Sequence, residues 1–126
     1  AKNIAIEVFN VIGKTIWVNT ENQLDIATAV AGSGPAFLAL VAEGLADGAV
    51  KAGLERHISK ELVQGLFDSV ASLLEDNHPA IIKDSVMSPN GTTAQGYAQL
   101  EEAGVRDAMM KAVQSAYDKA VEISKK

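Results

Sequence analysis

Apolar side chains recur three and four residues apart along most of this chain, which is the spacing of one face of an α-helix. The clearest faces comprise Leu62, Leu66, Val70, Leu73 and Leu74, and then Val105, Met109, Val113, Ala116, Ala120 and Ile123. Only Thr15–Val18, which is β-branched and aromatic, suits a β-strand. The pattern predicts a mainly α fold, a helical bundle with one strand near the N-terminus.

Turn and capping residues divide the chain into six or seven predicted helices. Thr20 and Gln23 form a capping-box pattern before one of them. The predicted helices are Lys2–Ile12, Thr20 to about Ala31, Pro35 to about Ala52, a helix capped by Ser59, a short helix from His78 and Pro79, Thr93–Gly104, and a last helix from Val105. A length of 126 residues is typical of one domain.

The strand has no evident partner in the sequence. An isolated strand is not stable, because its backbone groups need a neighbouring strand. We therefore expect its sheet to lie in another part of the protein or in another subunit.

The helix from Pro35 to about Ala52 is apolar on nearly all sides for two turns, which predicts a central, buried helix. Gly44 and Gly48 each cost roughly 1 kcal/mol against alanine, which is tolerable where helices approach closely. Alanine and glycine are abundant in this helix, and this favours intertwined packing.

The same helix carries Glu43, Asp47 and Lys51 four residues apart. The spacing favours an ion pair between Asp47 and Lys51. Glu43 and Asp47 could also form an acid/base pair, and the alternative is a solvated helix face.

The composition excludes several classes of function. A net charge of −5 with no basic stripe argues against nucleic acid as a partner. With no cysteine and two histidines, the chain offers neither a disulfide nor a structural zinc site. No apolar run reaches the roughly 20 residues of a membrane span, and no signal peptide is visible. These features fit a cytoplasmic protein with no membrane contact.

The segment Ser88–Thr93 joins two turn-forming pairs, Ser-Pro and Asn-Gly, to two hydroxyl residues that can begin a helix. Thr92 and Gln95 form a second capping-box pattern. A tight loop before a helix presents unpaired backbone N–H groups and the positive end of the helix dipole. The segment therefore suits a carboxylate or phosphate, and the alternative is an ordinary capped helix after a turn.

Other candidate sites rest on weaker patterns. Gly32-Ser33-Gly34 could form an anion-binding nest or a simple turn between helices. Ser88, His78 and Asp84 could compose a hydrolytic triad, but sequence spacing does not establish its geometry. No Gly-x-Gly-x-x-Gly pattern follows a strand, so a redox role would require a cofactor held mostly by other residues.

Several stretches share their order and spacing with one known family. They are Asp25–Phe37, Glu43–Val50, Gly53-Leu54, Ser88–Thr93, Leu100–Arg106 and Ala112–Ala116. Across about residues 3–123 the chain thereby resembles the C-terminal domain of the pyrroline-5-carboxylate reductase family. Two of these stretches, Asp25–Phe37 and Ser88–Thr93, are separate motifs of the family in the same order, which makes this resemblance more specific than one short motif would be.

The resemblance implies part of a two-domain oxidoreductase of proline biosynthesis. In this family an N-terminal Rossmann domain binds NADP or NAD, and a helical C-terminal domain dimerises and completes the substrate site. The enzyme reduces 1-pyrroline-5-carboxylate to L-proline. Residues 1–20 would be the tail of the Rossmann domain, which would explain the lone strand, and residues 21–126 the helical dimerisation and substrate-binding domain.

The resemblance also implies partners and site residues. The chain would form a homodimer or higher homo-oligomer, and would be inactive without the Rossmann domain. The substrate carboxylate would lie on the backbone N–H groups of Gly91, Thr92 and Thr93 and on the Ser88 hydroxyl. Thr93 matches the catalytic position whose hydroxyl lies near the imine nitrogen. No metal is implied.

Asn90 is a departure, because the family commonly has glycine at this position. Asparagine tolerates left-handed backbone angles better than other non-glycine residues, so the turn can be kept. This substitution leaves open the alternative of a non-catalytic helical dimerisation module.

Overall fold

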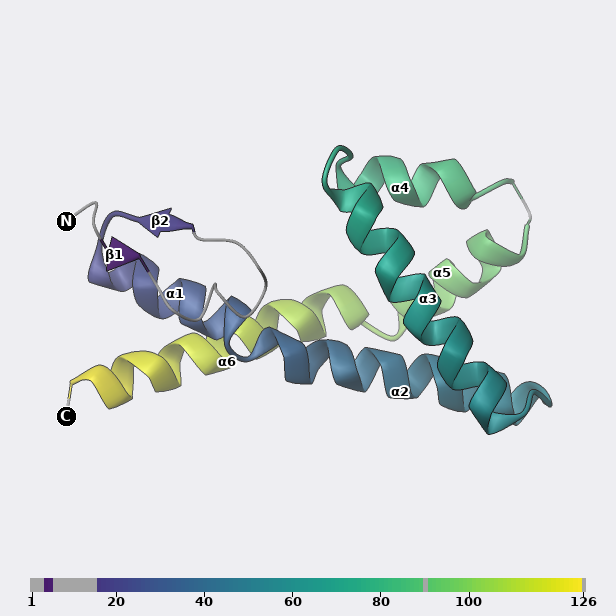
Figure 1. Ribbon diagram of the computed structural model, residues 1–126, viewed down its shortest axis with the longest axis horizontal. Helices are drawn as coiled ribbons and strands as arrows, with labels where there is room; N and C mark the ends of the chain where they lie inside the picture. Colours follow the sequence, from purple (N-terminus) through teal and green to yellow (C-terminus); the bar gives the residue numbers. More distant parts are fainter. Residues whose placement is uncertain (1–3, 6–15, 90, 126) are drawn as a thin grey trace. The chain divides into compact units, whose positions relative to one another are not determined.

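The computed structural model describes residues 4–5, 16–89 and 91–125 (Figure 1). These residues form two short strands and six helices: β1 (Ile4–Ala5), β2 (Trp17–Val18), α1 (Glu21–Ala31), α2 (Gly34–Ala52), α3 (Arg56–Leu74), α4 (Pro79–Val86), α5 (Thr92–Glu102) and α6 (Val105–Ser124). The chain divides into two compact units, residues 1–38 with 105–126, and residues 39–104. The predicted helical fold is confirmed.

The predicted strand is present as β2, and it has a partner within the chain. It pairs antiparallel with β1, so that Ile4 lies opposite Val18 and Ala5 opposite Trp17. The helix predicted for Lys2–Ile12 is therefore wrong at Ile4 and Ala5, and its other positions lie outside the described residues. An extended segment needs partners for its backbone groups, and β1 supplies them locally.

The N-terminus of α1 is capped as the sequence predicts. The Thr20 hydroxyl accepts a hydrogen bond from the Gln23 backbone N–H at 3.1 Å. The Gln23 side chain reaches one residue further back than a standard capping box, to the Asn19 N–H at 2.7 Å. Two N–H groups at the start of the helix are thereby satisfied.

Replacing this cap should destabilise the fold measurably. We expect Thr20→Ala to lower the free energy of unfolding by about 1 kcal/mol, because it leaves the Gln23 N–H without its side-chain acceptor. Thr20→Ser keeps an acceptor and should restore most of the loss. Urea unfolding at one fixed chain concentration measures both variants, and an unchanged midpoint for Thr20→Ala would refute the role of the cap.

The first unit is built on the packing of α1 against α6. Ala29 and Ala31 are buried on α1. The Tyr117 hydroxyl of α6 donates a hydrogen bond to Asn22 Oδ1 of α1. The predicted apolar face of α6 is half-buried at Met109, Val113, Ala116 and Ala120. Around Ala31, the half-buried side chains of Val18, Leu24 and Ala27 complete this small core.

In the second unit, α3 begins earlier than the sequence predicts. Its N-cap is Glu55, and Ser59 lies inside the helix, fully buried, with its hydroxyl donating to the Glu55 carbonyl at 3.0 Å. The prediction of Ser59 as a cap is therefore wrong. The physical reason lies at the end of α2, where Gly53 takes φ 122° and Leu54 N–H bonds to the Ala49 carbonyl, so the chain reverses within a few residues.

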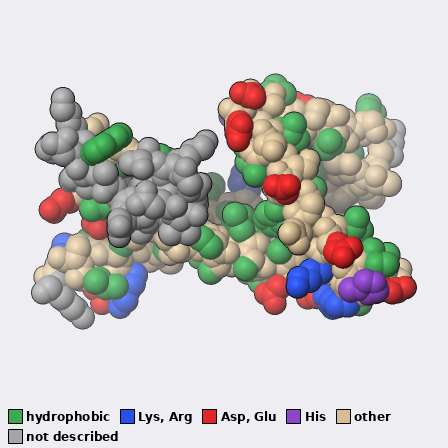
Figure 2. All heavy atoms as spheres, viewed as in Figure 1, with side chains coloured by type: hydrophobic (Ala, Val, Ile, Leu, Met, Phe, Trp, Pro, Cys, Tyr) green, Lys and Arg blue, Asp and Glu red, His purple; other side chains and the backbone are tan. Residues whose placement is uncertain are grey.

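The prediction that α2 is buried is wrong for a single copy of the chain. Ala46 is its one buried residue, and Leu40 is 69% exposed. Apolar side chains lie open on the molecular surface (Figure 2). The apolar residues of α2 are as expected, but the described residues of this chain do not cover them.

The exposed apolar helix also meets a simple criterion for membrane spans. The stretch Glu21–Ala52, which includes α1 and α2, is long and apolar enough to cross a membrane by length and composition. One such stretch is weak evidence, because helices from soluble proteins meet the same criterion. The absence of a membrane partner stays a prediction.

Candidate functional site

The predicted loop connects α4 to α5 within the second unit. Met87 ends α4 in an extended conformation, and its N–H bonds to the Asp84 carbonyl at 3.4 Å. Gly91 N–H then bonds to the Ser88 carbonyl at 3.1 Å, which closes a tight turn before α5. Asn90 lies outside the described residues. The turn places Ser88 close to Gly91, directly before Thr92 and Thr93.

The capping box predicted for Thr92 and Gln95 does not form. The N-cap of α5 is Gly91, in an extended conformation with φ −84° and ψ 176°, and it has no side-chain cap. Gln95 N–H bonds to the Gly91 carbonyl at 3.2 Å as the first backbone bond of the helix. The turn that begins at Ser88 ends at Gly91, so α5 begins one residue earlier than predicted. Thr92 is therefore the first helical residue and not the cap.

The α5 N-terminus has the geometry of an anion site. The N–H groups of Thr92, Thr93 and Ala94 come before that of Gln95, which is the first to find a helical acceptor, so they have no carbonyl partner within α5. Ser88 and Thr92 are exposed, whereas Gly91 and Thr93 are half-buried. Donors, the positive end of a dipole and two accessible hydroxyls therefore meet at one place.

Gly91 leaves room for the Ser88 hydroxyl. A Cβ atom on Gly91 would lie 2.5 Å from Ser88 Oγ and 3.3 Å from the Ser88 carbonyl oxygen. Its φ of −84° is accessible to every residue type, so the requirement is steric and not conformational. A larger residue would displace the Ser88 hydroxyl.

The other residues of the predicted triad, His78 and Asp84, make local contacts instead. His78 caps α4, with Nδ1 accepting from the Ala80 N–H at 3.0 Å, and Asp84 lies 3.4 Å from the Lys83 ammonium. These roles give no support to a triad with Ser88. Within the described residues, no group of three His, Cys, Asp or Glu side chains could hold a metal.

The predicted pair between Asp47 and Lys51 is replaced by another. Asp47 Oδ1 accepts from Arg56 Nη1 at 2.7 Å, which joins α2 to the start of α3. Gly32 also has a structural role, because a Cβ there would lie 2.8 Å from the Thr28 carbonyl oxygen at the end of α1. The Asp47–Arg56 ion pair and the close packing at Gly32 therefore both lie where one helix ends and the next begins.

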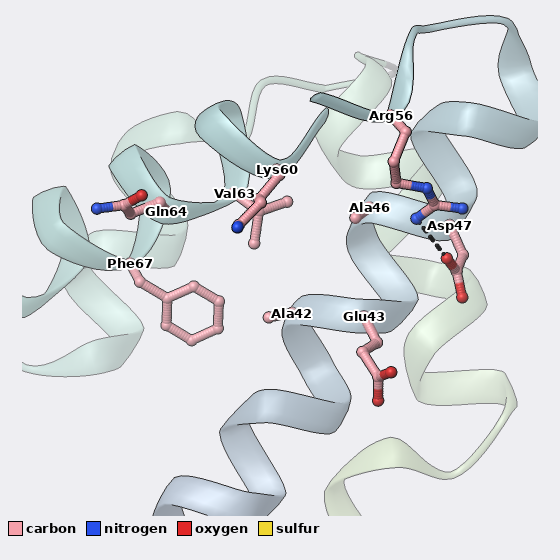
Figure 3. Close-up of a pocket in the computed structure, with 9 residues that line it drawn as sticks. All are labelled: Ala42, Glu43, Ala46, Asp47, Arg56, Lys60, Val63, Gln64 and Phe67. Atoms are coloured by element: carbon pink, nitrogen blue, oxygen red, sulfur yellow. Dashed lines mark hydrogen bonds and ion pairs between the residues drawn. The ribbon is translucent and has the colours of Figure 1, made fainter. Parts of the chain in front are cut away.

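A groove between α2 and α3 was not predicted from the sequence. It encloses about 420 Å³, and Phe67 and Val63 of α3 face Ala42 of α2 across it (Figure 3). The Arg56–Asp47 ion pair closes one end. The abundance of alanine in α2, including Ala42 and Ala46 of the groove, was the available signal, because small side chains leave room beside a neighbouring helix.

Comparison with known proteins gives one consistent result. Residues 21–123 match the family model described as "Pyrroline-5-carboxylate reductase dimerisation". Pyrroline-5-carboxylate reductase from Synechocystis is 46% identical over 94% of this chain and 45% of its own length. The enzyme of that name from Methanosarcina acetivorans is 43% identical over 97% of this chain and 46% of its own length. The chain thus spans a little under half the length of these curated relatives.

Solved structures agree with the sequence matches. A pyrroline-5-carboxylate reductase from Coxiella burnetii superimposes with a TM-score of 0.79 at 33% identity, over 85% of this chain and 40% of that one. The pyrroline carboxylate reductase of Plasmodium falciparum, solved with NADP bound, gives 0.76 at 36% identity, over 81% and 40%.

Proposed function

Since the chain belongs to the pyrroline-5-carboxylate reductase family, whose dimerisation model it matches over residues 21–123, we propose that it supplies the dimer interface and the substrate-carboxylate site of such an enzyme. The intact protein would reduce 1-pyrroline-5-carboxylate to L-proline with NADPH or NADH in the cytoplasm. The observation that carries the proposal is the N-terminus of α5, which has no side-chain cap and follows the turn that begins at Ser88, in a chain of this family.

The substrate carboxylate would bind at the start of α5. Backbone N–H groups of Thr92 and Thr93 would donate to its oxygens, together with the exposed Ser88 hydroxyl. Hydrogen bonds to a charged group are worth about 1.5–3 kcal/mol each, so a few of them give useful affinity for a small ligand. The helix dipole adds to the attraction.

Thr93 would orient the reacting end of the substrate. Its side chain is half-buried, and it lies in the same first turn as the N–H groups proposed to hold the carboxylate. A threonine hydroxyl is a weak acid, so its proposed role is to hydrogen-bond the imine nitrogen or to relay a proton through water. Binding both ends of a small ring fixes the orientation of the imine carbon.

The nicotinamide cofactor is proposed to be held by other residues. When bound, it would supply the hydride. The described residues contain two-residue strands and no glycine-rich turn between a strand and a helix, so they do not fit a dinucleotide. At the substrate site, the role proposed for this chain is therefore to bind and orient the substrate and to assist its protonation through Thr93.

Dimerisation is supported by the apolar surface of a single copy. Hydrophobic residues make up 48% of the chain, yet the buried hydrophobic residues in its described part are Ala29, Ala31 and Ala46. Large apolar side chains of α2 and α3 stay exposed, among them Leu40, Leu62 and Leu66. An exposed surface of this kind is typical of an obligate interface. We propose that a second copy covers it.

Activity measurements test the whole proposal. We expect the intact protein to convert 1-pyrroline-5-carboxylate to proline with oxidation of NADPH or NADH, and the purified 126-residue chain to show no such oxidation, since it lacks a dinucleotide fold in its described part. An intact protein that forms dimers but does not turn over this substrate would instead be a non-catalytic dimerisation module.

The role of Thr93 gives a sharper test. We expect Thr93→Ala in the intact enzyme to lower kcat at least tenfold, which is less than the roughly hundredfold or more of a full general acid, because a hydroxyl that orients or relays does less. Thr93→Ser keeps the hydroxyl and should retain most of the activity. Circular dichroism should show unchanged helix content in both. Lost helicity with normal specific activity would make Thr93 a structural residue.

A further inference from the structure

The loop between α4 and α5 is held by few buried contacts. No residue of α4 or α5 is buried. The backbone bonds that shape the loop are local, from Met87 to Asp84 and from Gly91 to Ser88. These bonds fix the turns themselves, but they do not fix how the face of α5 that carries Thr93 is turned toward α4.

A side-chain contact joins α4 and α5 across the loop. The Lys83 ammonium of α4 lies 5.4 Å from the centroid of the Tyr97 ring of α5. This distance is within the roughly 6 Å of a cation–π interaction. The Lys83 side chain is 34% exposed and also lies 3.4 Å from Asp84 Oδ1, so its charge is partly shielded from water and held on one side.

The position of Tyr97 links this contact to the proposed substrate site. Thr93 and Tyr97 are four residues apart in α5, so they share one face, and both are half-buried. Lys83 is half-buried near the C-terminal end of α4, four residues before Met87, where the chain leaves the helix in an extended conformation. Fixing the Tyr97 ring against Lys83 therefore fixes the face of α5 that presents Thr93.

We infer that Lys83 and Tyr97 form a clamp that positions Thr92 and Thr93, at the start of α5, for the substrate carboxylate, as positioning residues that do not touch the substrate. The inference rests on the proposed function of the loop. Gly96 makes the clamp more important, because a glycine inside α5 weakens the helix, and no atom lies within 4 Å of where its Cβ would be.

The test uses the intact enzyme and four single variants. Lys83→Met and Tyr97→Leu each remove one half of the clamp, whereas Lys83→Arg and Tyr97→Phe keep a cation and a ring. We expect the first two to raise KM for 1-pyrroline-5-carboxylate about two- to fivefold, with kcat changed less. The conservative pair should stay near wild type. The double variant Lys83→Met/Tyr97→Leu should be no worse than the stronger single variant.

Amide hydrogen exchange separates the clamp from the function of the loop. Exchange at residues 91–93 should rise about two- to fivefold in Lys83→Met and in Tyr97→Leu. Unchanged exchange in either variant, a higher KM for Lys83→Met alone, or faster exchange with an unchanged KM would each overturn the inference. A wild-type enzyme without activity on this substrate would refute the proposed function, and the exchange result would still decide whether the clamp exists.

Discussion

Leu62→Asp should convert the dimer proposed for this chain into monomers at micromolar concentration. Leu62 lies on α3 and is 61% exposed in a single copy, so the substitution removes little packing within the chain itself. Across a two-fold interface the same change occurs twice. Losing the burial of two leucines costs about 3 kcal/mol, and placing two carboxylates in an apolar contact adds to this. We expect the dissociation constant to rise at least a hundredfold.

Ala71→Asp provides a matched control on the same helix. It introduces the same charge at an exposed position nine residues along, which a helical repeat of 3.6 residues places on the opposite side of α3 from Leu62. Sedimentation velocity over a range of concentrations measures both variants, and circular dichroism follows their helicity. Dimers of equal stability in the two variants would show that this face of α3 is not the interface.

Leu40→Asp extends the test to α2. Leu40 is 69% exposed, and it lies on the helix that the sequence predicted to be buried. A loss of dimer in both Leu40→Asp and Leu62→Asp would assign both helices to one interface. This result would explain why α2 is predicted to be buried but is exposed in a single copy, because the second copy would cover it.

Two identical sequence patterns in this chain show why helix starts are only partly predictable. Thr20 and Gln23 form the predicted cap of α1, whereas Thr92 and Gln95 do not cap α5. An extended strand leads into Thr20, so Thr20 itself takes the extended conformation that a cap needs, with φ −139°. A tight turn leads into α5, and Gly91 takes that role. The capping pattern is local, but the conformation before it decides whether it is used.

The burial of an apolar helix face can be predicted from the sequence only where another part of the same chain covers that face. On α6, which contacts α1 of the same chain, the predicted face is half-buried at Met109 and Val113 and exposed at its end, at Ile123. The face of α3 around Leu62 and Leu66 has the same periodicity and stays exposed. Hydrophobic spacing shows which side of a helix avoids water, but it does not show whether the covering surface belongs to the same molecule.

The site follows the same division between local and distant information. The loop Ser88–Thr93 and the helix after it could be predicted, because turn residues and hydroxyls act over a few positions. The closeness of Gly91 to Ser88 Oγ and of Lys83 to Tyr97 could not, because each depends on the path of the backbone through the loop.

Gly91→Ala should raise KM for 1-pyrroline-5-carboxylate by tenfold or more in the intact enzyme. The added Cβ would lie 2.5 Å from Ser88 Oγ, which is closer than atoms of this kind approach, so the hydroxyl must turn away. If that hydroxyl holds the substrate carboxylate, the enzyme loses a hydrogen bond to a charged group, worth about 1.5–3 kcal/mol. The backbone angles of Gly91 suit alanine, so we expect helix content to be unchanged.

Gly96→Ala is the control for the same chemical change in the same helix. Nothing lies within 4 Å of where its Cβ would be, so this variant should keep the wild-type KM. It should also gain up to about 1 kcal/mol in the free energy of unfolding, because alanine favours the helix. A rise in KM for both variants would mean that any added methyl group in α5 disturbs the site.

A double-mutant cycle with Ser88→Ala identifies the cause of the Gly91 effect. Without the Ser88 hydroxyl, the Cβ of Gly91→Ala meets the Ser88 carbonyl oxygen at 3.3 Å, which a small shift relieves. Gly91→Ala should therefore change KM much less in the Ser88→Ala background than in the wild type. Equal effects in the two backgrounds would show that the glycine acts on the substrate or the backbone directly, and that the Ser88 hydroxyl is not the group it keeps in place.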